Sequence, residues 1–316
     1  MIITLTANPS LDRTVALSAA LAPGEVQTAA SVREDAGGKG INVTRVLRGS
    51  RIDSTAVLPL DPADPFGAVL SGARVPVIPV EVAGVARANL TLADPDGITT
   101  KVNLPGVTRS AADAAALVDT VVEASVGARW LVLAGSLPPG LPDDFYVDVV
   151  AAVRAAGGEP PRIAVDTSGP ALRAVVDAAH PDLIKPNEDE LAELAGVALD
   201  ASAPFPEQVA AIARSLVPAR VGAALVTLGG AGAVLVSEAG AWHGTPPPTT
   251  VRSTVGAGDS SLAGYLIAES RGASPEECLR SGISYGSAAA ALPGTQAPTP
   301  ADILPGDVPV RALPRA

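Results

Sequence analysis

Short apolar runs that alternate with helix-like periods place the strongest constraint on how this chain folds. The runs span residues 130–135, 162–169, 182–187 and 223–230, and each ends at Gly, Pro or Asn. The helical periods span residues 111–126, 143–156, 188–194 and 207–216. Alternating strands and helices predict an α/β fold with a central, mostly parallel sheet, because the connecting helices must pack on its two faces.

Two segments break this rhythm, residues 14–36 and 85–104, where apolar and polar residues alternate around an Asp-Pro-Asp-Gly turn in the second segment. We expect them to form a small β lid outside the main core. Such a lid either closes over a site or pairs with a second copy, since both arrangements shelter its open edges. The rest of the chain is expected to form an α/β core from residues 1–13, 37–84 and 105–316.

Composition limits the partners of the chain. A length of 316 residues favours one large α/β domain with a minor appendage. The net charge of −11 argues against nucleic-acid and anionic-membrane partners, so an anionic substrate must be met by a few placed cations. Only three of the 22 cationic side chains are lysines, and they lie in or beside the motifs below: Lys39, Lys101 and Lys185.

The remaining composition favours a cytoplasmic protein without a metal cluster. The start, MIITLTANPSLDR, predicts a buried strand and not a signal peptide. The uncharged residues 221–237 are too few to span a membrane and contain three glycines, which predicts two strands around a tight turn. The single Cys278 excludes an internal disulfide, and the two histidines suggest neither a triad nor a zinc site. The Pro-rich stretch after Leu292 is expected to be an irregular tail.

The segment STVGAGDSSLAG places a glycine loop before an apolar helix. Gly256, Ala257 and Gly258 let backbone N–H groups approach an anion, and a helix N-terminus adds free donors and a favourable dipole. This pattern suits a phosphoryl group in transfer. Asp259 has two interpretations, a helix cap or a general base for an attacking hydroxyl.

A second glycine cluster, EDAGGKGIN, also ends at a predicted helix. It is not a P-loop, because Lys39 is followed by Gly40 and not by Ser or Thr. Lys39 and Asn42 together indicate a site for hydroxyls and one negative charge, although a plain turn explains the glycines equally well. Asp12, just after the first strand, is a candidate acceptor for sugar hydroxyls.

Two further motifs follow predicted strands. In LIKPNEDELAEL, Lys185, Asn187 and Glu190 lie at the carboxyl end of a strand, where open α/β sheets bind ligands. One Asn and one Glu are enough for Mg²⁺ that also binds waters and nucleotide phosphates, but an ordinary acidic helix start is as good an explanation. In VTLGGAGAVLV, Thr227 and Gly229 lie either along a nucleotide or in a simple hairpin.

Five motifs in order, GGKGIN, GSLPPG, KPNEDE, VTLGGAG and STVGAGDS, resemble the ribokinase-like carbohydrate kinases of the PfkB type across nearly the whole chain. NPSLDRTV and TTKVNLPG make the chain most similar to members that phosphorylate fructose 1-phosphate. The resemblance implies a core of about nine strands, a β lid that also makes a homodimer contact, and transfer from ATP with Mg²⁺ to the 6-hydroxyl, giving fructose 1,6-bisphosphate and ADP.

The resemblance also implies roles for individual residues. Asp259 would be the base, with the backbone from Gly256 to Asp259 as the anion hole. The sugar hydroxyls would be bound by Asp12, Gly38 and Asn42, and the substrate's own phosphate by Lys39, Arg87, Lys101 and Ser136. ATP would be lined by Lys185, Asn187, Thr227, Gly229 and Gly232, and Mg²⁺ would be held by Asn187 and Glu190.

The chain also departs from the family pattern. Ser253 stands where many members carry Asp, so a monovalent-cation site does not follow from the resemblance. The stretch between Asn42 and the lid is short, which predicts an altered wall of the sugar pocket. Alternative functions are a kinase for tagatose 6-phosphate or fructose 6-phosphate, and a sugar-phosphate sensor without turnover.

Overall fold

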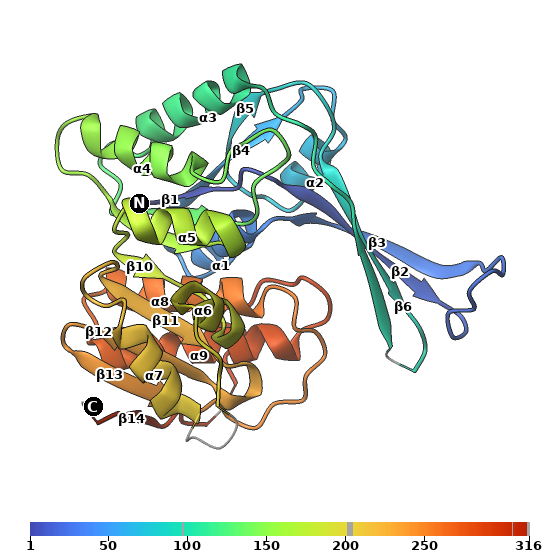
Figure 1. Ribbon diagram of the computed structural model, residues 1–316. Helices are drawn as coiled ribbons and strands as arrows, with labels where there is room; N and C mark the ends of the chain where they lie inside the picture. Colours follow the sequence, from blue (N-terminus) through green and yellow to red (C-terminus); the bar gives the residue numbers. More distant parts are fainter. Residues whose placement is uncertain (97, 201–204, 305, 315–316) are drawn as a thin grey trace.

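The computed structural model describes residues 1–96, 98–200, 205–304 and 306–314, and it contains a large sheet between two layers of helices (Figure 1). The large sheet has ten strands. Their order is β5 (Val77–Glu81), β4 (Ser54–Leu60), β1 (Ile2–Leu5), β8 (Trp130–Ala134), β9 (Arg162–Asp166), β10 (Leu183–Ile184), β11 (Ala223–Thr227), β12 (Ala233–Ser237), β13 (Gly240–Gly244) and β14 (Val310–Ala312).

The seven strands from β5 to β11 run parallel, and β12, β13 and β14 continue the sheet in antiparallel pairs. The chain leaves β1 toward β4 on one side and returns to β8 on the other. In open α/β sheets, ligands bind at the carboxyl ends of the strands beside such a reversal. The fold therefore directs attention to the loops after β1, β8, β9 and β10.

Helices cover both faces of the sheet because both faces are apolar. Along β1, Ile2 packs into the core on one face, and Ile3 and Leu5 pack into the core on the other. One layer contains α3 (Ala111–Ala124), α4 (Phe145–Ala155), α5 (Gly169–Ala178), α6 (Glu188–Ala195) and α7 (Phe205–Arg214). The opposite layer contains α1 (Lys39–Gly49), α8 (Ala257–Ser270) and α9 (Pro275–Ala291), and α2 (Phe66–Gly72) packs near its edge.

The small sheet consists of β3 (Ala29–Gly37), β2 (Ser10–Leu17), β6 (Arg87–Ala93) and β7 (Thr99–Asn103), in that order. It projects from the body as a twisted ribbon (Figure 1). The outer pairs are antiparallel and the central pair is parallel. Gly97 of the expected Asp-Pro-Asp-Gly turn lies outside the described residues.

The predicted α/β class with a parallel sheet and a separate small sheet is confirmed. Residues 221–237 form the hairpin β11–β12, as expected, and no helix in the described ranges is long and apolar enough to cross a membrane. One prediction was wrong: the Pro-rich end is not wholly irregular. Its residues Val310–Ala312 pair with β13 as the edge strand β14, so the large sheet has ten strands where about nine were expected.

Candidate active site

The carboxyl ends of the parallel strands bring three polar side chains to one edge of the large sheet. Ser136 follows β8, Asp166 ends β9, and Lys185 follows β10 directly. The loop after β1 joins them, because Asn8 donates a 3.3 Å hydrogen bond to Ser136 Oγ. Residues far apart in the sequence thus meet where parallel sheets usually bind ligands.

Asp166 is the charged centre of this edge. Its carboxylate is fully buried, and Lys39 Nζ donates a 2.7 Å hydrogen bond to Oδ1. Lys185 Nζ lies 3.2 Å from Oδ2. Burial raises the pKa of Asp166, but the charges of Lys185 and Lys39 outweigh it and leave the pKa below its ordinary value. Asp166 in turn raises the pKa of Lys39, so both groups of this pair are ionised at neutral pH.

Asp259 lies in the first turn of α8 and is only 6% exposed. The helix begins after Gly256, which has the left-handed conformation with φ 76°, and no side chain of the described residues caps its N-terminus. Asp259 Oδ2 instead accepts a 2.8 Å hydrogen bond from Asn42 Nδ2 of α1. Of the two interpretations of Asp259, the cap finds no support in the geometry, whereas a carboxylate held by one donor suits a base.

Burial is the main reason that the pKa of Asp259 rises to about 6, and the negative charge of Asp166 raises it further. Lys39, Asn42 and Lys185 lower it and only partly offset these two effects. A carboxylate with this pKa is mostly ionised at neutral pH and yet basic enough to accept a proton. Perturbation by burial together with specific charges in a cleft is typical of functional sites.

The N-terminus of α8 faces the same cluster. A Cβ added to Gly258 would lie 3.1 Å from Lys185 Nζ, so the ammonium group approaches the backbone of the first turn. Ala257 and Gly258 also line the pocket described next. Backbone N–H donors, the helix dipole and a lysine therefore surround one small volume, which is a favourable environment for an anion.

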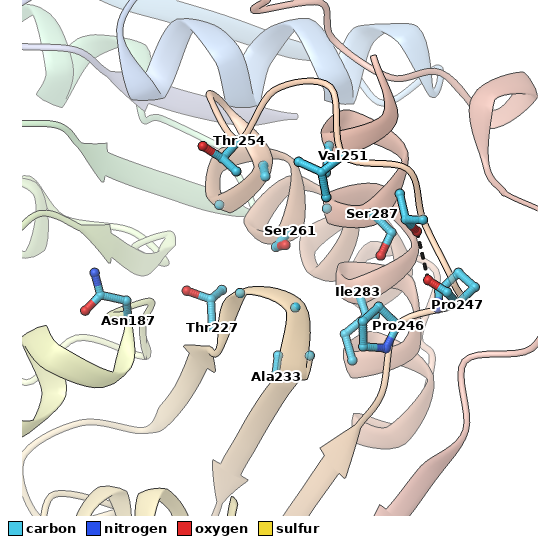
Figure 2. A pocket seen from close by; sticks show the side chains of 18 of the residues that line it. Asn187, Thr227, Ala233, Pro246, Pro247, Val251, Thr254, Ser261, Ile283 and Ser287 are labelled. Atoms are coloured by element: carbon cyan, nitrogen blue, oxygen red, sulfur yellow. Dashed lines mark hydrogen bonds between the residues drawn. The ribbon is translucent and has the colours of Figure 1, made fainter. Parts of the chain in front are cut away.

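A pocket of about 650 Å³ lies between α8, α9, the end of β11 and the loop after β13. Asn187 and Thr227 lie at one end of it, and Pro246, Pro247 and Ile283 lie at the other (Figure 2). The remaining predicted nucleotide residues on its wall are Gly229 and Gly232. Polar groups at one end and apolar groups at the other suit a ligand with a charged part and a flat, apolar part.

Gly232 has a structural reason of its own. It has φ 97°, and a Cβ there would clash with the carbonyl oxygen of Gly244. The pocket wall at this point is therefore bare backbone.

Asn187 and Glu190 form a capping box at the start of α6. The Asn187 side chain accepts a 2.8 Å hydrogen bond from the Glu190 N–H, and Glu190 Oε2 accepts one of 2.9 Å from the Asn187 N–H. The helix-start interpretation of this motif is therefore realised, and it leaves the second carboxylate oxygen of Glu190 outside the box. No group of three His, Cys, Asp or Glu side chains is placed to hold a metal in the described part of the chain.

The small sheet contributes the polar side chains around Asp12. Ser10 Oγ and Asn89 Nδ2 donate hydrogen bonds of 2.8 and 2.9 Å to Asp12 Oδ1. Burial raises the pKa of Asp12, partly offset by these hydrogen bonds and by the charge of Arg87. A Cβ at Gly37 would clash with the Asp12 carboxylate, so the second glycine cluster leaves room for this side chain. Arg87 Nε is buried and has no hydrogen-bond partner among the described residues.

The predicted sugar-site residues divide into two groups. Lys39 and Asn42 of α1 contact Asp166 and Asp259, and Gly38 begins that helix with φ 129°. Lys101 lies apart from them on β7 and is exposed. It is opposite Thr91 of β6, which lies two residues after Asn89 and therefore on the same face of the small sheet. No hydrogen bond or ion pair joins Lys101 to the cluster in the described ranges.

Sequence reasoning missed Asp166 and Asn89. Asp166 ends the buried run in RIAVDTSG. A carboxylate at the end of a buried strand was a signal that could have identified it. Asn89 lies in RANLTL and is opposite Asp12 in the parallel pair β2–β6. No periodicity of the sequence predicts that parallel pairing, so Asn89 had no usable signal.

Comparisons with known proteins show the family to which the chain is similar. The model of the pfkB family of carbohydrate kinases matches residues 6–302. A 1-phosphofructokinase of Rhodobacter capsulatus is 35% identical over 99% of this chain and 98% of its own length. The ATP-dependent 6-phosphofructokinase isozyme 2 of Escherichia coli is 33% identical over 93% of this chain and 94% of its own.

Solved structures show the same similarity. The crystal structure of phosphofructokinase-2 from Escherichia coli in complex with potassium has a TM-score of 0.87 and 32% identity, and the match covers 96% of each chain. Ribokinase from Thermotoga maritima has a TM-score of 0.76 at 19% identity, with 96% of this chain and 98% of that chain covered. The second match supports the fold alone.

Proposed function

Because the chain belongs to the pfkB family of carbohydrate kinases, we propose that it transfers the γ-phosphoryl group of ATP to the 6-hydroxyl of fructose 1-phosphate. The products are fructose 1,6-bisphosphate and ADP. The observation that carries this proposal is the environment of Asp259. Its buried carboxylate accepts a hydrogen bond from Asn42, has its pKa raised to about 6, and lies beside both a pocket and two lysines.

Each side chain has a part in the transfer. Asp259 accepts the proton of the attacking hydroxyl, which is general-base work of the kind worth about 10²- to 10⁴-fold in rate. The backbone N–H groups from Gly256 to Asp259 face the phosphoryl oxygens and stabilise the charge that develops on them. Phosphoryl transfer needs mostly positioning and charge neutralisation, and this arrangement supplies both.

ATP occupies the 650 Å³ pocket in this proposal. Its phosphates lie toward Gly258, Lys185, Asn187 and Thr227, and its base lies toward the apolar end formed by Pro246, Pro247 and Ile283. The glycines at positions 229 and 232 let the nucleotide approach the backbone closely.

The donor set beside the pocket fits Mg²⁺. Asn187 lines the pocket, and the carboxylate of Glu190 has one oxygen outside the capping box. The free carboxylate oxygen of Glu190 and the second lone pair of Asn187 Oδ1, whose first lone pair accepts the Glu190 N–H, would together with waters and nucleotide phosphates match the ligands that Mg²⁺ prefers. Asn187 and Glu190 would hold the ion, which would neutralise phosphate charge when bound.

The acceptor lies between α1 and the polar face of the small sheet. Asp12 and Asn42 bind its hydroxyls, and the backbone at Gly38 approaches it closely. Its own phosphate is met by Arg87, whose Nε lacks a partner in the described part of the chain, and by Lys101 and Ser136. Lys39, which was also expected at this phosphate, is bound to Asp166 and acts on Asp259, so we assign it to the end of the sugar where transfer takes place. A kinase for an uncharged sugar would leave these cations without an anion to meet.

The opposite face of the small sheet carries an apolar patch beside the Arg13–Glu34 ion pair, and this patch suits a second copy of the chain. Strand register places Val15, Val32, Leu90, Leu92 and Val102 on one face, and Val32 and Val102 are 56% and 45% exposed. We propose a homodimer in which two such faces pack together, since a patch of this kind on an otherwise acidic chain is sheltered best by an identical patch.

The test is ADP release with Mg-ATP and a panel of acceptors: fructose 1-phosphate, fructose 6-phosphate, tagatose 6-phosphate and fructose. We expect the highest kcat/KM with fructose 1-phosphate. Preference for fructose 6-phosphate or tagatose 6-phosphate would keep the chemistry and change the acceptor. Binding of sugar phosphate without any ADP release would overturn the kinase proposal in favour of a sensor.

A further inference from the structure

Asp166 is a buried charge that the transfer chemistry above does not use. It has no exposed surface and lies at the end of β9. A carboxylate removed from water is unfavourable unless cations and hydrogen bonds compensate for the lost hydration. The fold retains this one at the centre of the candidate active site, which calls for a reason.

The two cations that compensate Asp166 come from different elements. Lys39 is the first residue of α1, and its 2.7 Å hydrogen bond reaches Oδ1. Lys185 follows β10, and its ammonium lies 3.2 Å from Oδ2. Asp166 is the only side-chain partner recorded for either ammonium within the described ranges. The carboxylate therefore joins the edge of the large sheet to the N-terminus of α1, with one lysine on each oxygen.

Each lysine also faces the place of transfer. Lys185 Nζ lies 3.1 Å from the position of a Cβ on Gly258, in the first turn of α8. Lys39 acts electrostatically on Asp259 and keeps 37% of its side chain exposed. Lysine is a point charge on a flexible stem, so the exact place of its ammonium depends on the group that the ammonium binds.

The charges of the four groups balance in a useful way. Lys39 and Lys185 carry two positive charges, and ionised Asp166 and Asp259 carry two negative ones. When Asp259 accepts the proton of a hydroxyl, the cluster gains one net positive charge. That charge arises at the moment when the phosphoryl group in transfer must be stabilised.

We propose that Asp166 is a positioning residue, which holds Lys39 and Lys185 on two sides of the phosphoryl group in transfer. This inference rests on the proposed kinase function. Asp166 touches neither substrate, and it acts through the two ammonium groups. Its loss releases both lysines from their places, and misplacement of this kind by about 1 Å lowers the rate of the chemical step by about 10²-fold.

The first test replaces Asp166 by Asn, which keeps the shape and removes the charge. We expect kcat to fall by about 10²-fold, a larger factor than any rise in the KM for ATP, because the substitution releases Lys185 but leaves Asn187 and Thr227 of the pocket in place. Glu269→Gln is the matched control, since Glu269 is also a largely buried acid between two cations, Arg129 and Arg162, at the opposite edge of the sheet. We expect this variant to keep its kcat. A normal kcat in folded Asp166→Asn would overturn the inference.

A second test distinguishes two roles of Asp166: positioning both lysines, or only neutralising the buried charge of Lys185. Lys185→Met is compared with the double variant Asp166→Asn, Lys185→Met, in which no uncompensated lysine is buried. If Asp166 also holds Lys39, the double variant has a lower kcat than Lys185→Met, by about tenfold or more. Equal kcat values in these two folded variants would show that Asp166 only neutralises Lys185, and would refute the proposal.

The outcomes also separate this inference from the proposed function. Absence of ADP release by the unmodified protein with every acceptor of the panel would refute the kinase proposal itself. Turnover by the unmodified protein together with unimpaired turnover by Asp166→Asn would leave the kinase proposal standing and refute the positioning role alone.

Discussion

Replacing Asp259 by Asn should stabilise the folded protein at neutral pH while it destroys turnover. The pKa of Asp259 rises from its ordinary value of 3.8 to about 6 in the folded chain, first because of burial and then because of Asp166. Each pKa unit corresponds to about 1.4 kcal/mol, so keeping Asp259 ionised in the folded chain costs about 3 kcal/mol. Asn has no charge to bury and retains the shape that accepts a hydrogen bond from Asn42.

The sign of the effect follows from the two protonation states. Above pH 6 the folded and unfolded chains both carry ionised Asp259, and the full destabilisation is present. Between pH 6 and 3.8 the folded chain binds the proton first, so the destabilisation decreases as the pH falls. Below 3.8 both states are protonated and it vanishes. The stabilising effect of Asp259→Asn is therefore largest at pH 7 to 8 and absent in acid.

Urea unfolding of both proteins at pH 8 and near pH 4 measures this difference, and ADP release measures turnover. We expect Asp259→Asn to be more stable by about 1 to 3 kcal/mol at pH 8 and slower by about 10²- to 10⁴-fold in kcat. If the role of Asp259 were to cap α8, Asn would cap the helix about as well, so the variant would keep its turnover and gain no stability at pH 8. That result would refute the reasoning.

Three further predictions test other parts of the site. The kcat of the unmodified protein should fall as the pH drops through about 6, because protonated Asp259 cannot act as a base; a pH–rate profile that stays flat to pH 5 would contradict this. Arg87→Met should raise the KM for fructose 1-phosphate about tenfold to 100-fold and leave the KM for ATP unchanged, since one charge-assisted hydrogen bond is worth about 1.5 to 3 kcal/mol. Steady-state kinetics measure both constants, and a raised KM for ATP with an unchanged KM for fructose 1-phosphate would show that Arg87 does not belong to the acceptor site. Val32→Asp should shift the protein to monomers in sedimentation velocity, whereas Val126→Asp, at a 76% exposed position after α3, should not; a monomeric unmodified protein would end the dimer proposal.

Local patterns in the sequence were enough to predict the strands and helices of the core. Runs such as residues 130–135 and 223–230 became buried parallel strands because both faces of the sheet are covered, and such strands read as continuous apolar runs. The edge strand β14 escaped notice, since three residues within a Pro-rich stretch carry no period. The small sheet was expected from its alternation, but the parallel pairing of β2 with β6 was not readable from either strand.

The candidate site was only partly predictable for a different reason. Its separate glycine loops and lysines are marked by local motifs, but the contacts between them join residues far apart in the chain. Lys39 meets Asp166 across 127 positions, and Asn42 meets Asp259 across 217. No local period reports such a pair, so Asp166 and the hydrogen bond that orients the base became visible only in three dimensions.

These long-range contacts also explain how the chain can maintain an unfavourable carboxylate. Asn42 of α1 supplies a hydrogen bond to Asp259, and Lys39 and Lys185 supply positive charges that lower its pKa. All three lie on elements that are fixed by the apolar cores on the two faces of the sheet. Packing of those cores therefore offsets the free energy lost at Asp259, and a base with a pKa near 6 exists only while the cores hold these elements in place. Loss of core packing should for this reason reduce turnover before the chain unfolds, because the base and its lysines separate first.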